Sequence, residues 1–262
     1  MMPSQDRDID IRRQGCAGRI TLHRPQALNA LTHDMVLEIE AALLKWRNDN
    51  DIALIIIDAE GDRAFCAGGD IEKLYQTGKA GNFDYGRTFW TDEYRLNALI
   101  ANYPKPYIAF MQGYVMGGGV GISCHGSHRI VCESTRIAMP ECEIGLVPDV
   151  GGSHLLANAP GRLGEFLAMT GTRMKAADTI QCGFADSFIP QENWEELKSR
   201  LCDTGEIGAV ADLAIDPGPS ELAQLGNEVD PIFASGSALQ CLQTLEMETE
   251  TWAAAAVKSI RR

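Results

Sequence analysis

The sequence lacks several features that would indicate common classes of protein. Only 7% of its 262 residues are aromatic, and no run of eighteen apolar residues is present that could form a transmembrane helix. The eight cysteines include no C-x-x-C pair, so neither a zinc knuckle nor a redox dithiol is indicated, and we expect buried, reduced thiols. The glycine patterns of dinucleotide-binding and P-loop proteins are missing. Residues 121–125, GISCH, also fail the G-x-S-x-G pattern of a serine hydrolase.

Positive charge is scarce as well. The chain has 23 Lys and Arg against 36 Asp and Glu, a formal net charge of -13 at pH 7. Because polyanions repel such a field, we expect neither nucleic acid nor a membrane as a partner. The N-terminal stretch MMPSQDRDIDIRRQG has no apolar core of a secretory signal and too many acids for a transit peptide. These features predict a cytoplasmic protein.

The first third of the chain has the pattern of an α/β fold. Residues 18–25, GRITLHRP, read as a strand that ends at Pro25, and helical spacing predicts a helix over 32–51 that begins at Thr32. Residues 52–60, IALIIIDAE, are almost wholly apolar and β-branched, which is typical of a strand buried on both faces. Strand, helix and buried strand in this order indicate an α/β protein.

Further elements follow. Asp70 stands at the N-cap of a helix after a glycine turn, and a second helix is expected over 87–103. Residues 106–115, PYIAFMQGYV, read as one buried strand. After residue 128 the pattern predicts a short strand, a loop, a helix that ends at Gly171 and a last strand over 183–190. From there polar helices are expected, so we divide the chain into a core, 1–190, and a helical C-terminal region, 191–262.

Two glycine-rich turns stand out. Three consecutive glycines occur in GYVMGGGVG, residues 113–121, and Ala67–Asp70 reads AGGD; each follows an apolar strand and precedes a helix. Glycine lets a ligand approach backbone N–H groups, and amides at a helix start favour a negative charge. Two such turns on neighbouring strands could form an oxyanion hole. Close packing without a ligand is the structural alternative.

Four ordered motifs carry a family resemblance. They are HRPQALNAL (23–31), FCAGGDI (65–71), GYVMGGGVG (113–121) and AMPECEIGLVPDVGG (138–152). With these motifs the chain, from about Ile20 to Pro190, resembles the crotonase (enoyl-CoA hydratase/isomerase) superfamily, and within it the 3-hydroxyisobutyryl-CoA hydrolase family of valine catabolism. The resemblance implies a crotonase-like spiral of repeated ββα units with a helical C-terminal section, a trimer or hexamer, and an acyl-CoA substrate. Against that family the C-terminal region is expected to be short.

The resemblance also implies where the substrate binds. The thioester oxygen would lie between the amides of Gly69 and Gly118, and Glu93 matches a glutamate that contacts the substrate. No cofactor is implied, because coenzyme A is part of the substrate. The residues implied to lie along it are Leu28, Ala30, Ala67, Asp70 and Ile71.

Carboxylates distinguish the candidate reactions. Hydratases of the superfamily have a glutamate where this chain has Gly121, and adding water across a double bond calls for an acid and a base. Glu141 and Asp149 remain, and they form the functional pair of the hydrolase pattern. Glu141 could activate a water or attack the thioester directly. Asp149 could orient the water or the substrate hydroxyl, or simply cap a helix.

We therefore predict an acyl-CoA thioester hydrolase that acts on a short branched 3-hydroxyacyl-CoA. An enoyl-CoA hydratase or isomerase with Glu141 as its single base is the first alternative, and a CoA-ester binding subunit with little turnover is the second. His125 and His128 have H-x-x-H spacing, but no acidic third ligand is near, so no metal site is expected.

Overall fold

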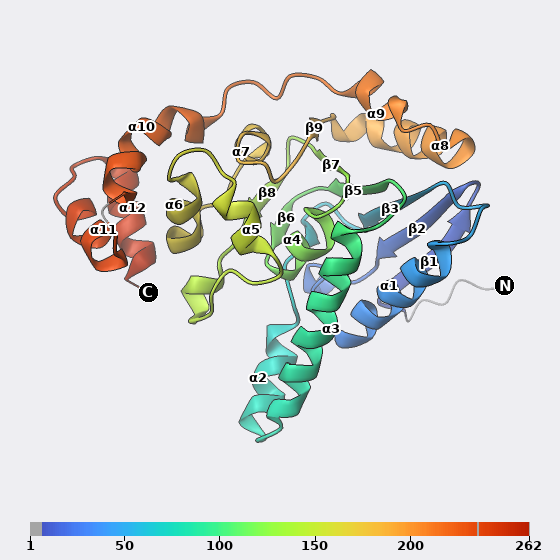
Figure 1. The fold of residues 1–262 in the computed structure, drawn as a ribbon, viewed down its shortest axis with the longest axis horizontal. Coiled ribbons are helices and arrows are strands. Elements are labelled where there is room, and N and C mark those ends of the chain that lie inside the picture. The colour runs from blue at the N-terminus through green and yellow to red at the C-terminus, as the bar shows by residue number, and fades with distance from the viewer. Residues whose placement is uncertain (1–6, 235, 262) are drawn as a thin grey trace.

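The computed structural model describes residues 7–234 and 236–261 as an α/β molecule with two sheets (Figure 1). The strands are β1 (Ile9–Gln14), β2 (Ala17–Leu22), β3 (Leu54–Ala59), β4 (Ala64–Cys66), β5 (Tyr107–Met111), β6 (Tyr114–Met116), β7 (His128–Val131), β8 (Arg136–Ala138) and β9 (Ser187–Phe188). The helices are α1 (His33–Trp46), α2 (Ile71–Lys79), α3 (Phe83–Ala101), α4 (Gly118–Ser123), α5 (Gly152–Ala157), α6 (Leu163–Thr170), α7 (Ala176–Gln181), α8 (Trp194–Thr204), α9 (Gly208–Leu213), α10 (Glu221–Phe233), α11 (Ala238–Leu245) and α12 (Thr251–Ile260).

Three successive pairs of strands, β3–β4, β5–β6 and β7–β8, each place their first strand in the larger sheet and their second strand in the smaller one. The larger sheet has the order β1-β2-β3-β5-β7-β9, and the smaller has the order β4-β6-β8. Apart from the antiparallel pair β1 and β2, the neighbouring strands within the described residues run parallel. The pairs β3–β4, β5–β6 and β7–β8 are each followed by helix, which confirms the predicted spiral of ββα units.

The prediction of one strand over 106–115 is wrong. The chain leaves the larger sheet after β5 and enters the smaller one at β6, with Gly113 at the corner. Gly113 has a φ of +57°, and a Cβ there would lie 2.3 Å from the carbonyl oxygen of Arg63. Only glycine fits such a bend. The same alternation of sheets adds β4 and β8, which the sequence pattern did not predict.

The β3 strand is buried on both faces, as predicted. Ile55 and Ile57 belong to the apolar cluster that also contains the buried face of α1. Leu54 and Ile56 belong to a second cluster, formed with Trp194 and its neighbours on α8. Because successive side chains of a strand point to opposite faces, α1 and α8 cover opposite sides of the larger sheet.

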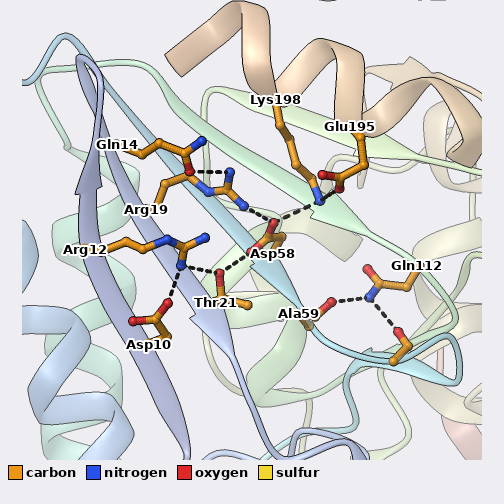
Figure 2. Close-up of polar contacts among 11 residues, drawn as sticks. Asp10, Arg12, Gln14, Arg19, Thr21, Asp58, Ala59, Gln112, Glu195 and Lys198 are labelled. Atoms are coloured by element: carbon orange, nitrogen blue, oxygen red, sulfur yellow. Dashed lines mark hydrogen bonds and ion pairs between the residues drawn. The ribbon is translucent and has the colours of Figure 1, made fainter. Parts of the chain in front are cut away.

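An ionic cluster fastens α8 to the sheet (Figure 2). The Asp58 carboxylate, on β3, accepts hydrogen bonds from Arg19 at 2.5 Å and Thr21 at 2.7 Å, and pairs with the Lys198 ammonium at 2.9 Å. Burial alone would raise the pKa of Asp58, but the charges of Lys198 and Arg19 outweigh it and lower this pKa. The buried aspartate is therefore a structural anion.

Helices α10 and α12 lie beside α6, and α11 packs against both of them, at the end of the molecule away from β1 (Figure 1). Phe166 of α6 makes edge-on ring contacts with Phe233 and Trp252. The helical C-terminal section is thus present, whereas the division at residue 190 stays a prediction. No helix within 7–234 or 236–261 is long and apolar enough to cross a membrane.

Candidate active site

The two predicted amides lie next to each other. β4 and β6 are parallel neighbours in the smaller sheet, so the turns that follow them leave the same edge. A Cβ built on Gly118 would lie 3.2 Å from the backbone nitrogen of Gly69. The chain therefore brings together the two glycine turns that the sequence singled out.

Steric crowding explains all three consecutive glycines. The Cβ position of Gly119 lies 2.3 Å from the backbone carbonyl oxygen of Cys66 on β4. Gly117 has a φ of +45°, and its Cβ position lies 2.7 Å from Oε1 of Glu141. The Cβ position of Gly118 lies 2.5 Å from Oε1 of Glu93. Carboxyl groups from two other segments thus occupy the space that side chains would fill. Gly117 and Gly118 thus leave room for carboxyl groups, and Gly119 allows close packing against the backbone of β4.

Three carboxyl groups line one small cavity at this point. Glu93 comes from α3, Glu141 begins a 3₁₀ turn at Glu141–Ile144 (η2), and Asp149 lies in the loop before α5. Together with Gly69 and Gly118 they surround a cavity of about 90 Å³. Two wider hollows, of about 460 and 570 Å³, lie along other helices and lack these glycine turns.

The site favours protonated carboxyl groups. Burial, followed by the charges of Asp149 and Glu141, raises the pKa of Glu93 to about 8. Burial and the charge of Asp149 raise the pKa of Glu141 to about 7. Burial also raises the pKa of Asp149, although a hydrogen bond from Tyr94 opposes it. A carboxyl group whose pKa lies near 7 is suited to act as a base at neutral pH.

Glu93 is expected to reduce stability at alkaline pH. Its pKa is higher in the folded chain than in the unfolded one, so the free energy of unfolding falls as pH rises from about 4.5 to about 8. Glu93→Gln should remove this penalty and therefore raise the melting temperature at pH 9. Each kcal/mol gained in the free energy of unfolding should raise the melting temperature by about 2–4 °C. At pH 4.5 we expect little effect. A melting series over pH measures it. The exposed substitution Glu38→Gln is the control, and an equal response of both variants at both pH values would contradict the prediction.

The residues implied to lie along coenzyme A are only partly in the cavity wall. Ala67 and Ile71 line it. Leu28 lies beside it, where its carbonyl accepts a hydrogen bond from the amide of Ala67 at 3.0 Å. Ala30 lies in the same adjoining segment. Asp70 is the N-cap of α2, as predicted.

The interpretation of Asp149 as a helix cap is wrong. Helix α5 has Gly151 as its N-cap, and the side chain of Asp149 instead accepts a hydrogen bond from the Tyr94 hydroxyl at 2.7 Å.

The structure also removes the alternative that Glu93 is a solvated acid, because only 2% of this residue is exposed.

Gly121, where the family resemblance implies a glutamate in hydratases, faces occupied space. A Cβ there would lie 2.7 Å from Nδ2 of Asn97 and 2.9 Å from Cβ of Val150. Asn97 lies one turn after Glu93 on α3, and its amide is buried without a hydrogen-bond partner among the described residues. Asn97 and Val150 thus fill the space that a side chain at position 121 would need. Helical spacing from Glu93 was the signal that could have identified Asn97.

The histidines and cysteines have separate environments. His125 bonds through Nε2 to the carbonyl of Val150 at 2.7 Å, and His128 meets the Ser127 hydroxyl at 2.9 Å. Within the described part of the chain, no three His, Cys, Asp or Glu residues are grouped so that they could hold a metal ion. The expectation of buried thiols holds for six of the eight cysteines; Cys16 is half-buried and Cys142 is exposed.

Comparisons with known proteins agree on the family. Residues 17–262 match the family model described as enoyl-CoA hydratase/isomerase. The mitochondrial 3-hydroxyisobutyryl-CoA hydrolase of Danio rerio is 42% identical over 250 residues, which are 91% of this chain and 65% of that protein. The human protein of the same name is 44% identical over 194 residues, 74% of this chain and 50% of the human one. The chain therefore spans less than two thirds of the length of these two relatives.

Solved structures share the fold under other names. A Rhodobacter sphaeroides structure, described as an enoyl-CoA hydratase, is 50% identical with a TM-score of 0.91, and the match covers 98% of this chain and 74% of the other. A Mycobacterium thermoresistibile structure, described as a carnitinyl-CoA dehydratase, is 40% identical with a TM-score of 0.94, and the match covers 97% and 75%. Fold and family agree across these proteins, whereas the activities in their names differ.

The prediction of a cytoplasmic protein is contradicted by these relatives, because the zebrafish and human proteins are both named as mitochondrial. Compartment is specified by a targeting segment that is read separately from the fold, so the charge of the first residues was a poor guide.

The motifs, the two-sheet spiral and the comparisons all indicate the same family. The chain belongs to the enoyl-CoA hydratase/isomerase family.

Proposed function

We propose that this protein hydrolyses the thioester of a short branched 3-hydroxyacyl-CoA, with 3-hydroxyisobutyryl-CoA as the first substrate to test. One observation carries the proposal: two backbone amides and three carboxyl groups meet at a single small cavity. The names of the zebrafish and human relatives support the choice of substrate. The small cavity favours a short acyl group over a long one.

In this proposal the thioester oxygen accepts hydrogen bonds from the N–H groups of Gly69 and Gly118. These donors stabilise the negative charge that develops on the oxygen when the carbonyl carbon is attacked. Glu141 either removes a proton from the attacking water or itself attacks, giving an anhydride that water then cleaves. In both routes the C–S bond breaks, and the thiolate of coenzyme A leaves and takes up a proton.

The other two carboxyl groups have supporting roles in the proposal. Asp149 orients the water or the substrate hydroxyl. Glu93, held mostly protonated at pH 7 by its raised pKa, can donate a hydrogen bond to the substrate. The reaction uses carboxyl groups, amides and water, so we propose that no cofactor is needed. A trimer or hexamer is also proposed, and light scattering would test it.

A hydratase is the second candidate, favoured by the name of the Rhodobacter sphaeroides protein. Against it stands Gly121, whose side-chain space is filled by Asn97 and Val150. Addition of water to a double bond would therefore have to use Glu93 or Asp149 as the second acid or base group beside Glu141.

An assay with two readouts separates these functions. Free thiol released from 3-hydroxyisobutyryl-CoA measures hydrolysis, and loss of enoyl-CoA absorbance at the same enzyme concentration measures hydration. We expect thiol release to dominate. Hydration without thiol release would instead establish the hydratase. Tight binding of an acyl-CoA with neither reaction would identify a binding subunit and overturn the proposed function.

A further inference from the structure

The loop that carries Asp149 holds one residue, Val150, in a backbone conformation that is rare for valine. Val150 has a φ of +45° and Gly151 a φ of +75°. Valine seldom adopts the left-handed region, because its branched Cβ collides with the backbone there. Such a conformation persists only where the surrounding structure holds it. The residues that hold this loop are therefore of interest for Asp149.

Two side chains from different elements hold the loop. The Tyr94 hydroxyl, on α3, donates to Oδ2 of Asp149 over 2.7 Å. The imidazole of His125, which follows α4, bonds through Nε2 to the carbonyl of Val150 over 2.7 Å. A carbonyl only accepts, so Nε2 carries the proton. The ring also lies against Gly151, where a Cβ would be 2.6 Å from Nε2.

We propose that Tyr94 and His125 are positioning residues, which together hold the Asp149 carboxylate in place beside Glu141 and the two glycine amides. Tyr94 fixes the carboxylate itself, and His125 fixes the strained backbone that follows it. The inference rests on the proposed function, in which Asp149 orients a reacting group. The inference also gives a role to His125, which follows α4 and takes no direct part in the proposed reaction.

Burial of its carboxyl group explains why Asp149 needs such a partner. Glu93 from α3 and Glu141 from η2 line the same cavity as Asp149, and His154 of α5 contributes to lowering the pKa of His125. Burial raises the pKa of Asp149, and the hydrogen bond from Tyr94 counteracts that effect. Without this donor the carboxyl group would be protonated at a higher pH and would be free to turn.

Tyr94→Phe tests the first contact, because it removes one oxygen from a residue that is 43% exposed and leaves the packing in place. We expect kcat for 3-hydroxyisobutyryl-CoA to fall about 10-fold, while KM stays within about 2-fold of the wild type. A 10-fold loss is what the removal of one hydrogen bond to a charged group should cause. The pKa of Asp149, followed by ¹³C NMR of its carboxyl carbon, should rise. Tyr75→Phe, on the exposed face of α2, is the matched control.

His125→Leu and His125→Gln test the second contact. Leucine cannot donate to Val150 and should lower kcat about 10-fold, whereas the amide of glutamine can donate and should restore most of the activity. Unchanged kcat and an unchanged Asp149 pKa in Tyr94→Phe would overturn the inference, as would equal activities of the two His125 variants. If the wild-type protein releases no thiol, the proposed function fails instead, and the NMR titration still decides whether Tyr94 controls Asp149.

Discussion

Glu141→Gln is expected to lower kcat for thiol release by about 100-fold or more, which is the usual contribution of a positioned base or nucleophile. Glutamine has nearly the same size and cannot accept the proton or form an anhydride. The Oε2 atom of Glu141 is buried and has no hydrogen-bond partner among the residues that the structure describes, so the carboxyl group is available to a substrate or water. Steady-state kinetics at pH 8, above the pKa of about 7, measures the effect.

The same 3₁₀ turn provides the control. Glu143→Gln changes an exposed acid two residues further on, and we expect kcat within about 2-fold of the wild type, as for most surface substitutions. Asp149→Asn should also reduce kcat. In the double variant with Glu141→Gln, the loss of transition-state stabilisation should be smaller than the sum of the two single losses, because the effects of residues that act as a unit are not additive. A folded Glu141→Gln protein with wild-type kcat would remove this residue from the mechanism.

Gly118→Ala is expected to lower kcat/KM by about 100-fold, comparable with the loss of an oxyanion-hole donor. The added methyl group would lie 2.5 Å from Oε1 of Glu93 and 3.2 Å from the nitrogen of Gly69. It would therefore take up the space between the two amides in which we place the thioester oxygen. Kinetics with 3-hydroxyisobutyryl-CoA would measure the loss, and circular dichroism would show whether the fold is retained.

Gly226→Ala is the matched control for this substitution. Gly226 lies inside α10, and a Cβ there has no atom within 4 Å. Alanine should leave kcat/KM unchanged and stabilise the helix by about 0.5–1 kcal/mol. If Gly118→Ala keeps wild-type kcat/KM while the protein stays folded, the thioester oxygen does not bind between these amides.

Local pattern was enough to predict much of the fold. The Thr32 and Asp70 caps and the end of α6 at Gly171 are where the sequence places them, because capping depends on a few neighbouring residues. The strand over 106–115 was predicted wrongly, since apolar residues stand on both sides of the bend at Gly113 and only the second sheet reveals the break.

For the candidate site, the residue types could be predicted from the motifs: two glycine turns, Glu141, Asp149 and the absence of a glutamate at position 121. Which of these groups meet depends on packing between distant segments. Glu93 becomes a buried acid because α3 packs against the α4 glycines, and Tyr94 reaches Asp149 across 55 residues of chain. Burial and charge proximity set the pKa of a carboxyl group, and both arise from contacts that no local pattern records. The motifs therefore indicate the chemistry, and the packing sets the protonation of the groups that would perform it.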